Sequence, residues 1–179
     1  MTTILALYDR AARHADHLSG WLLPSLARLV FAGVLAGYFW ASAATKLDGP
    51  FSPTAGAYAQ IFPRVFEAVG YDQSQLGLFH WLVVVAGAWA EFVLPLLILS
   101  GLLTRLAALG MVGFILVQSL TDIFGHGVET GAWFDRTSDA LILDQRAFWM
   151  LLLAVLVLKG AGPLSVDRLL AKATVRLPA

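Results

Sequence analysis

Apolar residues along this chain gather into four long blocks, separated by polar segments. The blocks cover residues 24–46, 81–101, 104–124 and 146–161. A helix rises about 1.5 Å per residue and the hydrocarbon layer is about 30 Å thick, so each block is long enough, or nearly so, to cross a bilayer. We therefore predict an all-α integral membrane protein, a single domain built as a four-helix transmembrane bundle.

The segments between the blocks contain shorter helical patterns. Residues 3–18 place apolar side chains near one face, which predicts an N-terminal helix lying in the membrane interface and broken at residues 19–24 by Ser-Gly and Pro. Residues 62–69 predict a short extracytoplasmic amphipathic helix. Ser165 is placed to cap a final short helix. Gly33 and Gly37, spaced as G-x-x-x-G, predict a helix-packing face in the first span.

A secretory signal is the competing interpretation of the first block. Residues 41–43 read Ala-Ser-Ala, which is typical of a cleavage site. The apolar stretch before them is longer than the core of an ordinary signal peptide. We therefore interpret the first block as a retained span.

Basic residues are distributed unevenly between the two sides of this bundle. Eight Lys and Arg residues fall on the side of both termini and four on the other side. The positive-inside rule then places both termini and the turn at residues 102–105 in the cytoplasm. The eight are Arg10, Arg13, Arg28, Arg105, Lys159, Arg168, Lys172 and Arg176.

Composition supports the membrane assignment and excludes several functions. Hydrophobic residues make up 59% of the 179 residues and charged residues only 13%. The formal net charge is zero, which argues against a nucleic-acid partner, because phosphate binding needs a basic face. No cysteine is present, so disulfides, thiolate metal sites and cysteine nucleophiles are excluded. No nucleotide loop or nucleophile–base motif appears, and we expect no catalysis by the chain alone.

Glu91 is the one charged residue near the middle of an apolar block. A charge at this depth costs about 2.5–3.5 kcal/mol, so the carboxyl needs a partner or a function. The small residues Gly87 and Ala88 share its helix face, which predicts that this face points into the bundle. Pro95 lies four residues later and is expected to kink the helix and free the Glu91 carbonyl. A structural carboxyl and a proton or ligand site both remain open.

Two partners for the Glu91 carboxyl follow from the spacing of polar residues on the other spans. Gln118 lies about one turn outward on the third span and would hydrogen-bond a protonated carboxyl. Lys159, on the fourth span, would either reach inward to pair or extend outward to the head groups. The sequence leaves this choice open.

A second group of polar residues is expected where the helices end on the outer side. Gln118, Asp122 and His126 follow an i, i+4, i+8 spacing and would share one face. Lys46 ends the first span at the same level and Arg146 begins the fourth, so Asp122 is expected to pair with one of them. Asp122 and His126 lack a clear third ligand, so we predict no metal site.

These residues together form a candidate binding pocket. Its members are Glu91, Gln118, Asp122, His126 and Lys46. A quinone head group or another small polar ligand is the cofactor that such a polar layer would accept.

The order of several short motifs resembles the DoxX family of small bacterial membrane proteins. They include a small residue followed by lysine at the end of the first span, a glutamate in the second, and a glycine-rich close before a Ser-Val-Asp tail. The resemblance implies a four-helix bundle in the bacterial inner membrane, with Lys46, Glu91 and Arg105 as its characteristic polar positions. Members are linked to membrane redox, sulfur and metal-stress systems.

Three functions are compatible with these features. The first is a non-catalytic anchor or assembly partner of other membrane or periplasmic subunits, docking through the external loop or helix faces. The alternative is an accessory subunit of a quinone-linked oxidoreductase, with a small-molecule pocket near Glu91. The third is a small transporter or channel, for which one mid-membrane charge is a poor basis unless the chain forms a homo-oligomer.

Overall fold

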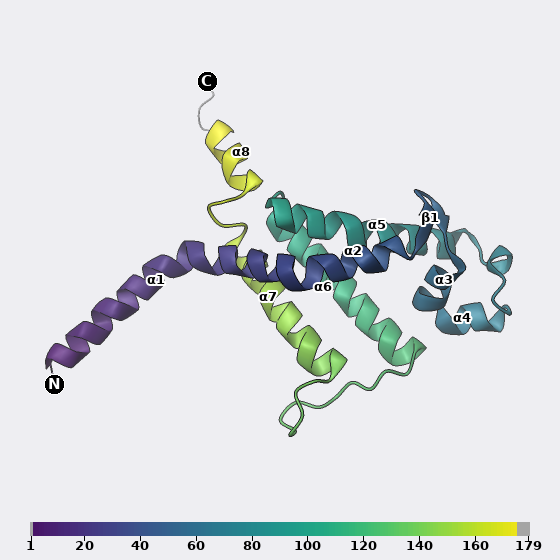
Figure 1. The fold of residues 1–179 in the computed structure, drawn as a ribbon, viewed down its shortest axis with the longest axis horizontal. Coiled ribbons are helices and arrows are strands. Elements are labelled where there is room, and N and C mark those ends of the chain that lie inside the picture. Colours follow the sequence, from purple (N-terminus) through teal and green to yellow (C-terminus); the bar gives the residue numbers. More distant parts are fainter. Residues whose placement is uncertain (1, 175–179) are drawn as a thin grey trace.

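The computed structural model describes residues 2–174 as a bundle of long helices with short elements at both ends (Figure 1). Within these residues, four helices are long and apolar enough to cross a membrane: Thr3–Ala44, Leu78–Ser100, Thr104–Gly125 and Leu141–Lys159. The predicted all-α membrane bundle is confirmed. The elements in chain order are α1 (Thr2–Phe31), η1 (Ala32–Ala36), α2 (Gly37–Ala44), β1 (Leu47–Gly49), β2 (Ser52–Pro53), α3 (Ala55–Ile61), α4 (Pro63–Ala68), η2 (Gln73–Gln75), α5 (Leu78–Ser100), α6 (Thr104–Leu120), η3 (Thr121–Gly125), η4 (Leu141–Gln145), α7 (Arg146–Lys159) and α8 (Val166–Thr174).

The core of the bundle lies between the first span, α6 and α7, with α5 contributing at one end. Its fully buried side chains are Phe31, Leu35, Phe39, Ile98, Met111, Ile115, Leu153 and Leu156. Buried alanines, including Ala36 and Ala108, lie among these larger residues and let the helices approach closely. Lipid offers no hydrophobic force between helices, so this close packing is what holds the spans together.

The first span and the segment before it form one continuous helix, so the predicted break at residues 19–24 is wrong. Pro24 lies inside α1, and the Ser25 hydroxyl donates to the Trp21 carbonyl at 2.7 Å. The helix continues through the proline, although the proline has no N–H to donate to the Gly20 carbonyl four residues earlier. Figure 1 shows α1 bending, with its N-terminal half directed away from the bundle.

Gly33 and Gly37 face outward from the bundle. Both are exposed, and a Cβ added to either would meet no atom within 4 Å. The predicted packing face is therefore wrong within this chain. Helix contact in the first span instead uses the opposite face, which carries the buried Ala36, Phe39 and Ala43.

The end of the bundle that carries both termini, called the terminal end below, is held together by Arg28 and Asp167. Arg28 donates to the carbonyls of Ile98 and Leu99 on α5, and to Ala161 and Leu164 after α7. The part of α1 around Arg28, the α5–α6 turn and the end of α7 therefore lie on one side of the bundle. This agrees with an even number of crossings.

Asp167 caps the start of α6 at the terminal end. Its carboxylate accepts from the backbone N–H groups of Leu103 at 2.7 Å and Thr104 at 3.0 Å. Burial by itself would raise the pKa of Asp167, but these hydrogen bonds, with the Thr104 side chain and the charge of Arg28, hold the pKa below its ordinary value. Asp167 is therefore anionic in the folded protein at neutral pH.

The link between α7 and α8 also packs closely at this end. Gly101 closes α5 with a φ of 71°, and a Cβ there would lie 2.6 Å from the Ser165 Cβ, so both its conformation and its contact require glycine. Ser165 accepts from the Arg168 N–H, which agrees with its predicted role as the cap of the last helix.

The opposite end, called the distal end, contains β1, β2, α3 and α4 (Figure 1). The two strands form an antiparallel hairpin that the sequence did not predict. The helix expected at residues 62–69 is present as α4. Phe66, Ala57 and Tyr58 pack with Val84 in a second small core, which fixes α3 and α4 against α5.

Candidate functional site

A cavity of about 550 Å³ opens between α5 and α6, with α2 on a third side. Figure 1 shows α5 and α6 diverging from their shared turn, and α3 and η3 lie at the wide end of this gap. All five residues of the predicted pocket line the cavity: Lys46, Glu91, Gln118, Asp122 and His126. Its volume falls within the range of about 300–1,000 Å³ that small-molecule pockets occupy.

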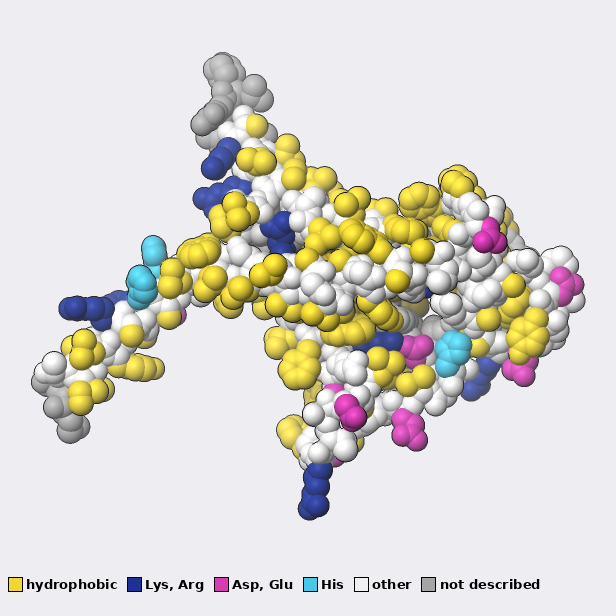
Figure 2. Space-filling view, viewed as in Figure 1, with side chains coloured by type: hydrophobic (Ala, Val, Ile, Leu, Met, Phe, Trp, Pro, Cys, Tyr) yellow, Lys and Arg dark blue, Asp and Glu magenta, His cyan; other side chains and the backbone are white. Residues whose placement is uncertain are grey.

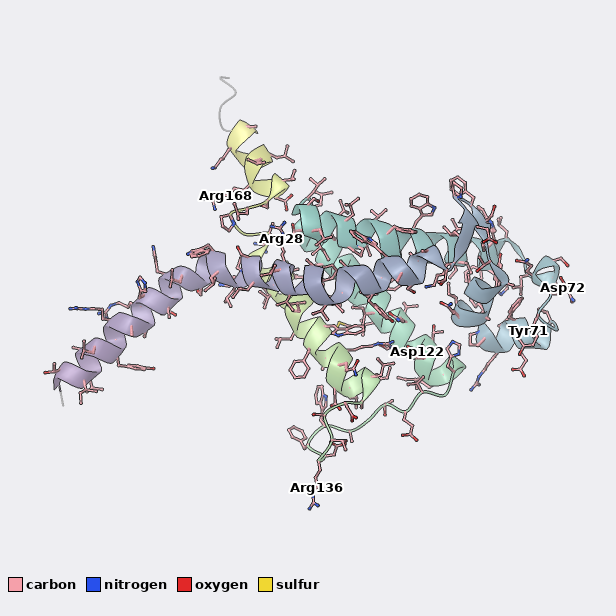
Figure 3. All side chains as sticks on the ribbon, in the orientation of Figure 1. Arg28, Tyr71, Asp72, Asp122, Arg136 and Arg168 are labelled. Atoms are coloured by element: carbon pink, nitrogen blue, oxygen red, sulfur yellow. The ribbon has the colours of Figure 1, made fainter. Side chains whose placement is uncertain are left out.

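The space-filling view shows the mouth of this cavity in the orientation of Figure 1. Figure 2 shows a hollow between the bundle and the short distal helices, with basic, acidic and histidine side chains at its rim. Asp122, which lines the cavity, is labelled near this position in Figure 3, by the distal end of α6. Charged groups therefore gather at the mouth of a space that lies inside an otherwise apolar bundle.

Lys46 and Glu91 form a buried ion pair on the α2 side of the cavity. The Lys46 Nζ lies 2.7 Å from Glu91 Oε2 and 3.0 Å from Oε1, and the two side chains are 6% and 3% exposed. Ser42 hydrogen-bonds both partners, at 2.5 Å to the ammonium and 3.2 Å to the carboxylate. The carboxylate inside the bundle is therefore compensated in charge and in hydrogen bonds.

The partner of Glu91 is Lys46, and not Gln118 or Lys159, the two candidates that the sequence offered. Gln118 does not contact the carboxyl, and Lys159 is exposed at the end of α7, as expected for a lysine that extends toward the head groups. The predictions failed because they assumed that all spans end at one level. Instead α5 continues past the end of α2 beside the β1–β2 hairpin, where Trp81 and Trp89 donate to the carbonyls of residues 51 and 50. This brings the end of α2 level with Glu91.

Arg146 and Asp122 form the second ion pair found among the described residues. Arg146 is the first residue of α7 and is 2% exposed; it also donates to the Ser119 hydroxyl at 2.9 Å. Of the two partners expected for Asp122, the structure has Arg146, because Lys46 is already held by Glu91. The Arg146 Nε is buried and, within the part of the chain that the structure describes, has no hydrogen-bond partner.

Gln118 uses only one end of its amide. The Nε2 atom lies 3.0 Å from the Tyr38 hydroxyl, and the Oε1 atom is buried with no partner among residues 2–174. The other end of the amide and the Arg146 Nε are thus two unsatisfied polar groups on residues that line one cavity. Buried polar groups almost always find a partner, so these two atoms are exceptions in this structure.

His126 joins the distal ends of α6 and α3. Its Nε2 lies 2.9 Å from the Gln60 carbonyl oxygen, and the neighbouring Gly125 approaches Pro63 so closely that a Cβ would lie 2.7 Å from its ring. His126 therefore closes the cavity at the wide end of the α5–α6 gap. Within residues 2–174 no cluster of three His, Cys, Asp or Glu side chains has the geometry to hold a metal ion.

Small residues leave the wall between α5 and α6 open. Gly87 and Ala90 on α5 and Gly110 and Gly113 on α6 all line the cavity. At Gly113 an added Cβ would meet nothing within 4 Å, whereas at Gly110 it would lie 3.1 Å from Leu94. Gly113 therefore marks free space, where a larger side chain would fill part of the cavity.

The prediction for Pro95 holds only in part. The helix α5 runs through Pro95 without interruption. The free backbone acceptor was expected at the Glu91 carbonyl. In the structure the Trp40 indole N–H donates to the carbonyl of the next residue, Phe92, at 3.2 Å. A neighbouring span therefore supplies a hydrogen bond near the proline.

Sequence reasoning missed two residues of the site, Tyr38 and Ser42. A signal for them was present, because Tyr38, Ser42 and Lys46 are each four residues apart and so share one helix face. Both carry hydroxyls in an apolar span. Lys46 was predicted from the sequence, but the two hydroxyl residues on the same helix face were not.

Comparison with known families identifies the chain. The sequence model of the DoxX family matches residues 23–127, more than half of the chain. No curated protein and no solved structure gives a match. The matched region holds the Lys46–Glu91 pair, Gln118, Asp122 and His126, whereas Arg146 and the glycine-rich tail lie beyond it. The chain is a multi-pass membrane protein that belongs to the DoxX family.

Proposed function

We propose that this DoxX-family protein binds the polar head group of a lipid-soluble small molecule, of the quinone class, in the cavity between α5 and α6. In this role the chain binds and orients the head group, as an accessory subunit of a membrane redox system whose electrons come from another protein. The observation that carries the proposal is that Gln118 and Arg146, which line the cavity, each have a buried polar atom without a hydrogen-bond partner among residues 2–174.

The polar chemistry of the cavity suits a quinone or quinol ring. Such a ring presents oxygens on opposite edges, each of which accepts a hydrogen bond and, in the reduced form, also donates one. The Arg146 Nε–H is a donor, and either end of the Gln118 amide can face the ligand, because the amide can rotate. The Lys46–Glu91 pair keeps its own partners and adds charges to the same wall without needing the ligand.

The apolar part of the cavity suits the tail of such a molecule. Leu94 on α5 and Phe114 and Val117 on α6 line it together with the glycines. Val117 is also largely exposed. An isoprenoid tail could therefore leave between α5 and α6 into the lipid, while the ring stays under the distal helices.

The proposal is tested by measuring bound quinone in purified protein. Full-length protein is extracted from membranes in mild detergent, and its organic extract is quantified by mass spectrometry. The variant Gly113→Leu fills free space in the cavity, and Gly33→Leu places the same side chain on the outward face of the first span, where it also meets open space. The quinone content should fall at least tenfold in Gly113→Leu and stay at the wild-type level in Gly33→Leu.

Two results would contradict this function. Wild-type protein that carries no quinone, and binds none when a short-chain quinone is titrated into the detergent solution, lacks the proposed ligand. Equal quinone content in wild type and Gly113→Leu places any bound quinone outside the cavity. Gln118→Leu adds a polar test, because it removes one unsatisfied group without adding bulk and should weaken binding.

The loop after η3 favours a second function, assembly with another protein. Phe134 is fully exposed there with a φ of 67°, and Trp133, also exposed, is fixed by its indole N–H to the Leu143 carbonyl at 2.7 Å. Two neighbouring exposed aromatic residues, one of them fixed by a hydrogen bond, are typical of a contact surface. Deleting residues 127–139 should abolish co-purification of a partner while leaving bound quinone unchanged, which separates the two functions.

A further inference from the structure

A groove at the terminal end collects basic side chains that the cavity does not use. It has a volume of about 650 Å³ and lies between the start of α6, the end of α7 and the start of α8, with Gly20 of α1 at one side. Arg105, Lys159 and Arg168 line it. Figure 2 shows Lys and Arg side chains gathered around the base of α8, and Figure 3 labels Arg28 and Arg168 in the same region.

The acidic residue in this groove is already engaged. The Asp167 carboxylate bonds the N–H groups of Leu103 and Thr104 at the start of α6, and Arg28 is held by four backbone carbonyls. Asp167 is therefore turned toward the start of α6, and Arg28, a further cation, adds no negative charge to the groove. One negative charge against three positive charges leaves the groove with a net charge of about two.

The three cations keep donors available. The Arg105 Nη1 donates hydrogen bonds to the carbonyls of residues 157 and 158, at 2.7 and 2.9 Å, which fixes the guanidinium in place. Within residues 2–174, no hydrogen bond or ion pair engages the side chains of Lys159 or Arg168, or the remaining nitrogens of Arg105. A preoriented arginine beside two unpaired cations matches the oxygens of a phosphate group.

Exposed leucines continue from the groove onto the sides of the bundle. Leu103 and Leu106 at the start of α6 and Leu158 at the end of α7 are 55%, 66% and 72% exposed, and Leu164 in the link to α8 is 82% exposed. These side chains lie where the apolar spans end. A ligand seated in the groove would therefore have its charged part among the cations and an apolar part against the leucines.

We propose that this groove binds the phosphodiester head group of an anionic phospholipid from the adjoining leaflet. Arg105 contacts the phosphate, Lys159 and Arg168 supply the excess charge, and the acyl chains lie along α6 and α7 over Leu106 and Leu158. A basic pocket between helix ends at a membrane surface is a recurrent way to hold such lipids. The site is separate from the α5–α6 cavity, and the inference does not depend on the function proposed for that cavity.

The test compares lipid binding by two double variants of the full chain in detergent, measured by native mass spectrometry with phosphatidylglycerol added. Lys159→Gln/Arg168→Gln removes two charges from the groove. Arg64→Gln/Arg136→Gln removes two exposed charges elsewhere, on α4 and in the distal loop. Each cation near an anionic head group contributes about a fivefold gain in affinity, so the groove variant should bind about 25-fold more weakly and the control variant as wild type.

Further arms identify the ligand. Phosphatidylcholine has the same phosphodiester but no net charge, and should bind the wild-type protein much more weakly than phosphatidylglycerol. Inorganic phosphate at millimolar concentration should not displace the lipid. The proposal is overturned if the groove variant binds phosphatidylglycerol as wild type does, if both double variants lose binding equally, or if phosphatidylcholine binds as well. Displacement by inorganic phosphate would assign the groove to a free anion instead.

Discussion

Removing either member of the buried Lys46–Glu91 ion pair should strongly destabilise the folded protein. The perturbation is a set of three variants: Lys46→Met, Glu91→Gln, and both together. Either single variant leaves one buried group without its ionic partner, because the two side chains are only 6% and 3% exposed. The double variant removes both charges, so that no uncompensated charge remains inside the bundle.

The expected magnitude follows from the contacts of the pair. Removing one member of a buried ion pair costs about 3–5 kcal/mol. Ser42 bonds both Lys46 and Glu91, so it remains a partner for whichever one is left, and we expect the lower end of this range, about 3 kcal/mol for each single variant. Replacing both charges is close to neutral in other proteins. The double variant should therefore lose less than either single variant.

The assay is reversible unfolding in mixed micelles, with SDS as the denaturant and helix content as the signal. Glu67→Gln and Lys172→Met change exposed charges and serve as controls, with expected effects within about 0.5 kcal/mol. Additive losses in the Lys46 and Glu91 variants, or single variants as stable as the controls, would refute the reasoning that the pair acts as one compensated unit.

Two further predictions concern the terminal end. Gly101→Ala should lower stability by more than about 1 kcal/mol, because it adds a Cβ at positive φ against Ser165, whereas Gly37→Ala, on an open helical face, should be neutral or slightly stabilising; thermal unfolding of both measures the difference. Asp167→Asn should cost about 1–2 kcal/mol by weakening the cap of α6. The pKa of Asp167 is lowered in the folded protein, so its carboxylate stabilises the fold fully above the ordinary pKa of 3.8. This stabilisation is lost as the pH falls through the pKa of Asp167 in the folded protein. The Asn variant should lack this acid-dependent loss of stability.

The spans were predictable from the sequence because apolar length alone determines which helices can cross a bilayer. The five residues that the sequence predicted for a pocket all line the cavity, since polar side chains in apolar helices have few alternatives to facing inward. That both ends of the chain lie on one side of the bundle followed from the even number of spans. Their placement in the cytoplasm stays a prediction, which rests on the distribution of Lys and Arg.

The partner of Glu91 was not predictable by counting residues along single helices. The depth of a residue depends on where neighbouring helices end, and the β1–β2 hairpin that sets the end of α2 against α5 has no strong signal in the sequence. Pro24 and the Gly33–Gly37 spacing failed for a related reason. Both are local patterns whose outcome depends on the surrounding structure: α1 continues through Pro24, and Gly33 and Gly37 face open space.

A density map of the full-length protein in a lipid nanodisc, with a saturating short-chain quinone, tests the central claim most directly. The account predicts ring-shaped density in the α5–α6 cavity, within hydrogen-bond distance of the Gln118 amide and on the side facing Arg146. An empty cavity at saturation, or quinone density confined to the outer surface of the helices, would contradict it.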